Sequence, residues 1–240
     1  MSRPRQRPGA PLSDRAAREA TAQDAACSPL LRLPPSLARR DRRRIGLLGG
    51  SFNPAHGGHL HLSREALKSL DLDEVWWLVS PQNPLKPARG MAPFRERLAR
   101  AAAAARGRQI KVSDIEARLG TRFTADTIAV LRRRFPATRF VWLMGADNLG
   151  QMDHWERWED IFRAVPIAVF ARPSYSLRAL SQRAAQRFAR RRVPVEAARN
   201  LAEFAAPAWV FFPSRLDSRS ATEIRSRLAA GQGRGGTVNA

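Results

Sequence analysis

A glycine-rich segment places two histidines three positions apart, at His56 and His59. It follows the apolar run 45–48 and precedes a helical pattern, so the sequence predicts a strand, a turn and the start of a helix. A helix N-terminus presents unpaired N–H groups and about half a positive charge, which suits a phosphate. The spacing of three puts both imidazoles on one face of the first helical turn, where each can donate a hydrogen bond to a phosphate oxygen.

Two other interpretations of this segment stay open from the residues alone. The histidines can be surface residues of an ordinary glycine-rich turn between a strand and a helix. A zinc site formed by His56, His59 and His61 is a weaker alternative, because no cysteine or carboxylate cluster lies near them in the sequence. We therefore expect no metal site built by the chain itself.

The residues GGSFNPAHGGHL at 49–60 resemble the first signature of the HxGH nucleotidyltransferase superfamily, and SATEIR at 220–225 resembles the second. Between the two signatures, short segments are similar to the landmarks of one branch, the bacterial nicotinate mononucleotide adenylyltransferases: 81–86, 123–127, 144–149, 154–155 and 171–173. The resemblance covers about residues 44–230. It implies that AMP is transferred from ATP, accompanied by Mg²⁺, to nicotinate mononucleotide, giving nicotinate adenine dinucleotide and pyrophosphate.

The resemblance also implies a role for particular residues. His56, His59 and Arg225 would be catalytic, with the two histidines contacting the ATP phosphates and stabilising the transition state. The other contacts with ATP would come from Gly49, Gly50, Ser51, Phe52, Gly58, Gly145, Asp147, Arg172, Ser220 and Thr222. Nicotinate mononucleotide would be bound by Lys86, Thr124 and Trp155, with the indole ring stacked on the pyridine ring.

Three of these residues have a purely structural alternative. Ser220 can be the N-cap of the last helix. Trp155 can belong to the apolar stripe of an amphipathic helix, together with the apolar residues of 158–162. Arg172 can equally pair with an acidic residue on the surface.

The chain departs from the usual family pattern at two positions. Asn53 stands where the family usually has Asp, so a role that needs a carboxylate there, such as organising the turn or helping a metal, is in doubt. The Asn side chain can still bond the backbone of the turn. Phe123 replaces a common Tyr and so lacks one hydroxyl.

From Arg44 onward, apolar runs rich in β-branched and aromatic residues alternate with helical patterns, which predicts a doubly wound parallel sheet in an α/β domain. The resemblance specifies this as a Rossmann-like nucleotidyltransferase fold. The predicted strands are 44–49, 75–80, 109–113, 139–144, 166–171 and 208–212. The predicted helices are 58–70, 93–106, 122–135, 154–164, 175–191 and 219–229. In such sheets ligands bind beyond the carboxyl ends of the strands, and the candidate segments follow those ends.

Composition sets the limits of this interpretation. The 240 residues suffice for one domain at 44–230, preceded by a disordered, basic Arg/Pro-rich arm at 1–43 and followed by a flexible tail at 231–240. The formal charge of +21 would suit nucleic acid, but only three of the 42 basic residues are lysines, an arginine bias that a GC-rich genome also produces. A single cysteine and the lack of a long apolar segment favour a cytoplasmic protein without a membrane partner.

Other functions stay open from the sequence. One group comprises other HxGH enzymes: nicotinamide mononucleotide or phosphopantetheine adenylyltransferases, and glycerol-phosphate-type cytidylyltransferases. A different class is an arginine-rich nucleic-acid-binding protein that uses the arm, although nucleic acid is not the expected partner. The preference for nicotinate over nicotinamide and the oligomeric state do not follow from the side chains.

Overall fold

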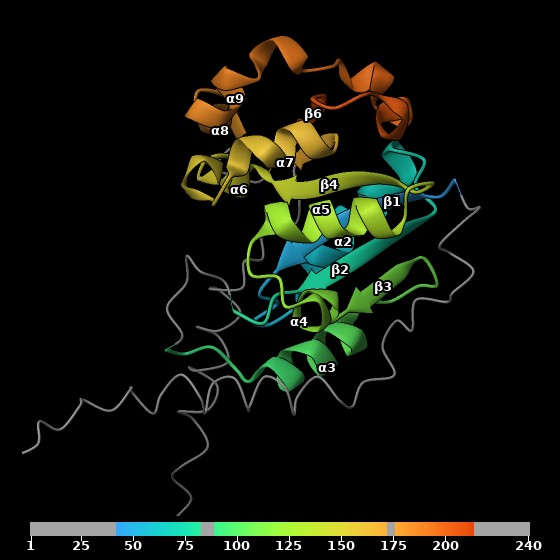
Figure 1. Ribbon diagram of the computed structural model, residues 1–240, viewed down its shortest axis with the longest axis vertical. Coiled ribbons are helices and arrows are strands. Elements are labelled where there is room, and N and C mark those ends of the chain that lie inside the picture. Colours follow the sequence, from blue (N-terminus) through green and yellow to red (C-terminus); the bar gives the residue numbers. More distant parts are fainter. Residues whose placement is uncertain (1–41, 83–88, 172–175, 214–240) are drawn as a thin grey trace, which may run out of the picture.

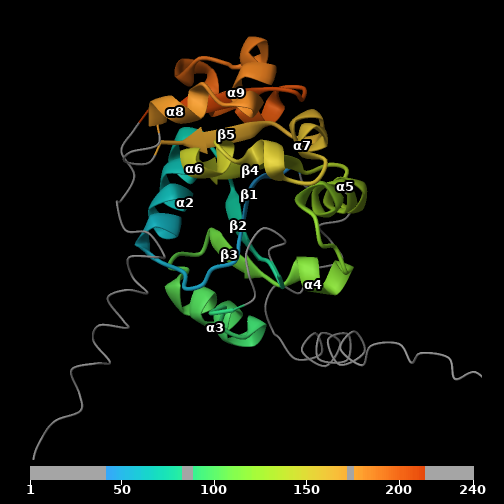
Figure 2. The ribbon, with the colours of Figure 1, turned by 90° about the vertical axis from the view of Figure 1, so that its left-hand side faces the viewer.

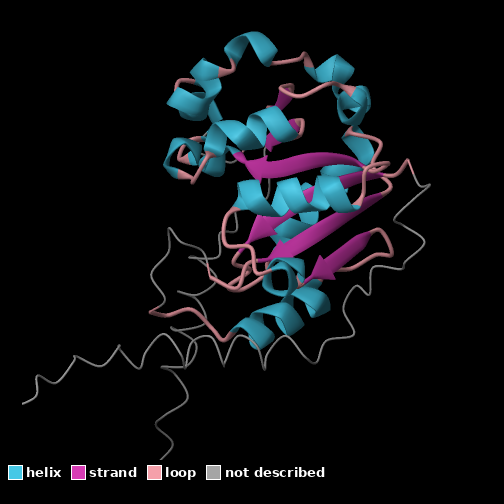
Figure 3. Ribbon diagram, viewed as in Figure 1, coloured by secondary structure: helices cyan, strands magenta, loops and turns pink. Residues whose placement is uncertain are grey.

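The computed structural model describes residues 42–82, 89–171 and 176–213, and it is centred on a six-stranded parallel sheet with the order β3-β2-β1-β4-β5-β6. The strands are β1 (Arg44–Gly50), β2 (Glu74–Val79), β3 (Ile110–Ser113), β4 (Arg139–Gly145), β5 (Ile167–Phe170) and β6 (Trp209–Phe212). All six lie within one residue of the predicted ends, and the predicted parallel α/β sheet is confirmed. The strand arrows point to one shared edge (Figure 3).

Helices cover both faces of this sheet (Figures 1 and 2). One face packs against a core cluster that includes residues of α4 (Ile115–Leu119), α5 (Thr124–Arg134), α6 (Ala146–Leu149), α7 (Trp158–Ala164), α8 (Ser176–Leu180) and α9 (Arg183–Arg187). The other face packs against α2 (Gly57–Ser69), α3 (Phe94–Ala104) and the 3₁₀ helix η4 (Val195–Glu203). Figure 2 shows the strands between α2 on one side and α5 on the other.

The apolar strands are continuous because each face of the sheet has its own core. In β2, Trp76 packs in one core cluster and the adjacent Trp77 packs in the other. The same alternation along β4 puts Trp142 on the α5 face and Leu143 on the α2 face. Successive side chains of a strand point to opposite faces, so a strand buried on both faces has no position for a polar residue.

Two predicted helices differ from the structure. The helix predicted at 154–164 begins only at Trp158, because Trp155 is extended and Arg157 has a positive φ of 50°. The helix predicted at 175–191 is divided into α8, α9 and the 3₁₀ turn η3 (Ala189–Arg191). The division falls where the Ser181 hydroxyl donates to the carbonyl of Arg178, a local bond that competes with helix formation.

Four elements were not predicted from the sequence pattern. The 3₁₀ helix η4 occupies a stretch between the helix and the strand predicted at 175–191 and 208–212, and it buries Ala198, Leu201 and Ala202 against the sheet. The other three are α4, α6 and the 3₁₀ turn η2 (Met152–His154). These three elements have only three to five residues and are too short to show a helical period.

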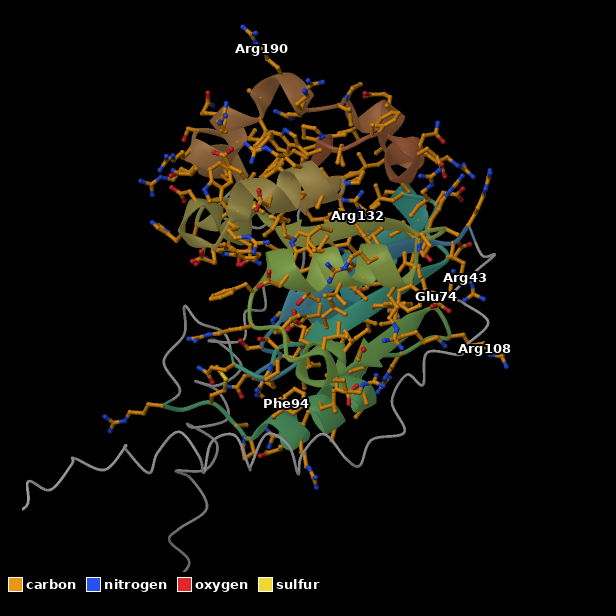
Figure 4. All side chains as sticks on the ribbon, in the orientation of Figure 1. Arg43, Glu74, Phe94, Arg108, Arg132 and Arg190 are labelled. Atoms are coloured by element: carbon orange, nitrogen blue, oxygen red, sulfur yellow. The ribbon has the colours of Figure 1, made fainter. Side chains whose placement is uncertain are left out.

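The surface arginines are spread over the described part of the chain. Arg43 precedes β1, Arg108 lies in the turn before β3, Arg132 is on α5 and Arg190 is on η3. In Figure 4, Arg190 projects from the top of the molecule, whereas Arg43 and Arg108 lie along its right-hand side. No helix in 42–82, 89–171 or 176–213 is long and apolar enough to cross a membrane.

Candidate active site

The carboxyl edge of the sheet brings together segments that are distant in the sequence. The order of the strands reverses between β1 and β4, which are adjacent and parallel, so the chain leaves their carboxyl ends in different directions. A crevice forms at such a switch point in doubly wound sheets. Gly50 ends β1 and Gly145 ends β4 at this point.

The turn after β1 is held in a strained backbone conformation. Phe52 has a φ of 47°, a region that non-glycine residues rarely occupy. Its buried ring stacks on Trp77 at a centroid distance of 5.1 Å and lies 4.7 Å from the ring of His59. This packing fixes the turn, and it uses the Phe52 side chain for the core.

Gly49 lacks a side chain because an indole ring occupies the space. A Cβ atom added at Gly49 would lie 2.5 Å from Cη2 of Trp142 on the neighbouring strand β4. At Gly50 the nearest atom would be Cε2 of Phe52, at an ordinary contact distance of 3.4 Å. The glycine at position 49 is therefore explained by packing within the sheet, whether or not a ligand approaches it.

His56 and His59 cap helix α2 reciprocally. His56 is the N-cap, and its Nδ1 accepts a hydrogen bond of 3.1 Å from the backbone N–H of Gly58. The backbone N–H of His56 in turn donates to Nδ1 of His59 at 3.2 Å. The arrangement is a capping box built from two imidazoles, whose centroids are 3.9 Å apart.

These cap bonds determine the tautomer of both rings. A nitrogen that accepts a hydrogen bond carries no proton, so Nδ1 is bare in each ring and the proton of the neutral imidazole is on Nε2. Both histidines therefore present an Nε2–H donor while Nδ1 stays engaged in the cap. The predicted strand-turn-helix geometry of the segment is confirmed, including the placement of both histidines in the first turn.

A buried hydroxyl lies in the same turn. Ser51 is almost fully buried, and its Oγ has no hydrogen-bond partner in the part of the chain that the structure describes. A buried hydroxyl without a partner is uncommon and calls for an explanation such as a ligand. Ser51 is one of the residues predicted to contact ATP.

Asn53 uses both ends of its amide to bind the chain that leads into α3. Its Nδ2 donates to the carbonyl of Gly90 at 3.2 Å, and its Oδ1 accepts from the N–H of Ala92 at 3.3 Å. A carboxylate can only accept hydrogen bonds, so an aspartate could not make the first of these bonds. The departure from the usual Asp thus fits the backbone that Asn53 contacts.

Two of the three residues predicted to bind the mononucleotide, Thr124 and Trp155, lie on the α5 side of the sheet. Thr124 is the first residue of α5, and Trp155 follows η2. Trp155 is half-buried, and its ring meets that of Trp142 edge to face at 6.3 Å. An ion pair between Asp126 and Arg157, at 2.9 Å, joins the two segments.

The alternative that Trp155 belongs to the apolar stripe of a helix is wrong, because Trp155 has an extended backbone. Trp155 lies outside α7, which begins three residues later. Trp155 still packs against the same core cluster as Ile161 and Phe162. It therefore has a core contact and an exposed part, and both are compatible with stacking on a ligand.

The remaining predicted site residues divide into two groups. Gly58 is the second residue of α2, Gly145 is the last residue of β4, and Asp147 lies in α6 directly after it. Lys86, Arg172, Ser220, Thr222 and Arg225 lie outside the described residues, as do nearly all of the arm 1–43 and the tail 231–240. Within 42–82, 89–171 and 176–213, no group of three or more His, Cys, Asp or Glu side chains is placed to bind a metal ion.

Two buried charged residues at this edge were not singled out from the sequence. Arg97 on α3 donates to carbonyl oxygens at the ends of β1 and β2, and Glu116 on α4 accepts from Thr127 Oγ1 at 3.5 Å. Burial raises the pKa of Glu116 to about 7, against the opposing effect of hydrogen bonds from Thr127 and Ser80. The available signal was the position of Arg97 four residues before Ala101, on the buried stripe of its helix.

The strand order β3-β2-β1-β4-β5-β6 is that of a Rossmann-like fold, and the N-terminus of α2 directly after β1 is suited to an anion such as a phosphate. The model of the cytidylyltransferase-like family matches residues 47–227. A probable nicotinate-nucleotide adenylyltransferase of Parvibaculum lavamentivorans is 58% identical over 186 residues, covering 77% of this chain and 92% of the relative. Another from Cereibacter sphaeroides is 54% identical over 191 residues, covering 80% of this chain and 99% of the relative. The chain belongs to the nicotinate-nucleotide adenylyltransferases of the cytidylyltransferase-like family, which act in NAD biosynthesis.

Solved structures share the fold. The nicotinic acid mononucleotide adenylyltransferase of Plasmodium falciparum has TM-scores of 0.57 in its complex with NaAD and 0.55 in its complex with APC. In both complexes the sequence identity is 15%, and the match covers 77% of this chain and 83% of the other. At this identity the likeness supports the fold alone.

Proposed function

We propose that this chain transfers AMP from ATP to nicotinate mononucleotide in a single displacement. The phosphate oxygen of the mononucleotide attacks the α-phosphorus of ATP, and the bond from that phosphorus to the β-phosphate bridging oxygen breaks, so pyrophosphate leaves. The product is nicotinate adenine dinucleotide. ATP enters as its Mg²⁺ complex, in which the metal neutralises the polyphosphate charge.

The observation that carries this proposal is the paired cap of α2. The Nε2–H groups of His56 and His59 are fixed by their Nδ1 bonds, at the carboxyl end of β1 and at a helix N-terminus. Donors that are already oriented stabilise charge that develops on phosphate oxygens without reorganising during the reaction. The buried Ser51 hydroxyl supplies a further donor to the same turn.

Other residues complete the proposed site by resemblance. Ser220, Thr222 and Arg225 would hold the β- and γ-phosphates, and the family match to residues 47–227 includes them. Gly145 and Asp147, at the end of β4, would border the adenosine, while Thr124 and Trp155 would line the nicotinate pocket. Gly49, Gly50, Phe52, Gly58, Lys86 and Arg172 would complete the contacts with the two substrates. As part of the same proposal, we place the enzyme in the cytoplasm.

Pyrophosphate release from MgATP tests this function. Three acceptors are compared with the purified full chain: nicotinate mononucleotide, nicotinamide mononucleotide and phosphopantetheine. We expect kcat/KM to be highest with nicotinate mononucleotide, by about tenfold or more, because a hydrogen bond to a charged group such as its carboxylate contributes about 1.5–3 kcal/mol. A higher kcat/KM with phosphopantetheine, or no release with any of the three acceptors, would refute the proposal.

A further inference from the structure

Among the described residues, Arg97 is the most deeply buried charged side chain at the carboxyl edge of the sheet. It lies in the first turn of α3 and is 1% exposed. Burial lowers the pKa of its guanidinium from the ordinary value, but an arginine stays protonated at every pH at which enzymes work. Burying a cation is unfavourable unless its N–H groups are all well bonded, so the partners of Arg97 are informative.

All hydrogen bonds of this guanidinium in the described residues go to backbone carbonyl oxygens. Nη1 donates to Ser51 O at 2.6 Å and to Ser80 O at 2.8 Å, and Nη2 donates to Pro81 O at 2.7 Å. Nε donates to Ala92 O at 3.0 Å. Within the same residues no carboxylate pairs with it, and its Cζ lies 5.6 Å from the ring centroid of Phe94 (labelled in Figure 4).

Three of these carbonyls, those of Ser51, Ser80 and Pro81, belong to segments that the sheet itself no longer joins. Ser51 follows β1, and Ser80 and Pro81 follow β2. In the part of the chain that the structure describes, the last backbone hydrogen bond between the two segments runs from Ser80 N to Gly50 O at 2.9 Å. Arg97 therefore continues the connection between β1 and β2 past the end of the ladder, and it does so at the residue that begins the histidine turn.

We propose that Arg97 is a positioning residue for adenylyl transfer, which fixes the turn carrying His56 and His59 to the carboxyl end of β2. This inference rests on the function proposed above. Without the guanidinium, the Ser51 carbonyl loses its link to Ser80 and Pro81, and the α2 N-terminus can shift relative to the sheet. Misplacement by about 1 Å can lower a rate about 100-fold, since catalysis depends on alignment.

The test compares Arg97→Ala and Arg97→Lys with Arg100→Ala, a control on the exposed side of α3. Thermal melts come first, and kinetics are measured well below each midpoint. We expect kcat to fall about 10- to 100-fold in both Arg97 variants while KM for ATP changes less than about threefold. Arg100→Ala should stay within about twofold of the parent in both parameters.

Chemical rescue separates positioning from a merely structural role. Millimolar guanidinium chloride should raise the kcat of Arg97→Ala at least about threefold, because the free ion can occupy the vacated carbonyls; urea and NaCl should not. Loss of stability alone predicts the opposite, because guanidinium is a denaturant. A parental kcat in Arg97→Lys would overturn the proposal, as would a folded Arg97→Ala that guanidinium does not rescue. Parental protein without pyrophosphate release would refute the proposed function instead.

Discussion

The backbone N–H of His56 donates to Nδ1 of His59, so the second histidine of the motif holds the N-cap residue of its own helix. The ring of His59 also lies against the rings of His56 and Phe52, at 3.9 and 4.7 Å. In His59, Nδ1 accepts the cap hydrogen bond, and this bond orients the ring and therefore its Nε2–H. Different substitutions of His59 can remove the function of one nitrogen and keep that of the other.

Replacing His59 tests the role of its Nε2–H. His59→Ala removes both nitrogens, and we expect kcat for pyrophosphate release to fall about 10²- to 10³-fold, the effect of losing one transition-state donor. His59→Asn places an amide near the position of Nδ1 and keeps the acceptor for His56. It should melt close to the parent but lose as much turnover as the alanine variant.

His59→Gln is the matched control, because its longer amide places an N–H donor near the position of Nε2. We expect it to retain more turnover than His59→Asn and to melt close to the parent, because Gln at the N3 position can also accept from the N-cap N–H. Equal turnover in the Asn and Gln variants would show that Nε2 has no special part in the reaction.

The sequence predicted the parts of this site that depend on local pattern. The twelve residues 49–60 specify a strand, a glycine turn and a helix start, and the structure has them in that order. The continuous apolar runs specified a buried parallel sheet, and the sheet placed Gly50 and Gly145 at one edge. The periodicity of apolar residues and the burial of parallel strands can both be inferred from a single sequence.

The contacts that arise only from folding could not be predicted in this way. Arg97 binds Ser51, which is 46 positions away, and Asn53 binds Gly90, which is 37 positions away. Trp142 explains the glycine at position 49, because β4 pairs with β1 and brings the indole ring next to it. None of these pairs has a spacing that a periodic pattern could reveal.

Gly49→Ala should destabilise the protein. Its methyl group would lie 2.5 Å from Cη2 of Trp142, so the indole ring must move, and overpacking of this kind costs about 1–3 kcal/mol. Gly50→Ala is the control, because its methyl group meets Phe52 at 3.4 Å and an alanine also restricts the unfolded chain. Urea denaturation should show a lower free energy of unfolding for the first variant only. Equal changes in both would contradict the assignment of Gly49 to sheet packing.

Glu116 should make stability depend on pH. Burial raises the pKa of this carboxyl to about 7 from an ordinary 4.5, so the folded state holds a proton that the unfolded state releases. The stability it contributes is therefore fully present below pH 4.5 and is lost as the pH rises through 7. At about 1.4 kcal/mol per pKa unit, the loss is on the order of 3 kcal/mol.

Glu116→Gln isolates this effect, because its amide is neutral throughout while every other carboxyl titrates as in the parent. The free energy of unfolding of the parent, minus that of the variant, should decrease between pH 5 and pH 8. Urea denaturation of both proteins at the two pH values measures the difference. A difference that is constant, or that grows with pH, would mean that Glu116 is already ionised in the folded protein at pH 5.

Trp155→Ala should weaken binding of the mononucleotide more than binding of ATP. The indole is half-buried and meets the ring of Trp142 edge to face, so its exposed part is available to a pyridine ring. Stacking of a base on an aromatic side chain contributes about 1–3 kcal/mol, so KM for nicotinate mononucleotide should rise about tenfold or more while KM for ATP changes little.

The matched control is Trp158→Ala, since Trp158 is also half-buried but its ring meets Phe162 and Phe188 edge to face. That variant should lose stability without a selective change in KM. An equal rise in both Michaelis constants for Trp155→Ala would assign this side chain to the core.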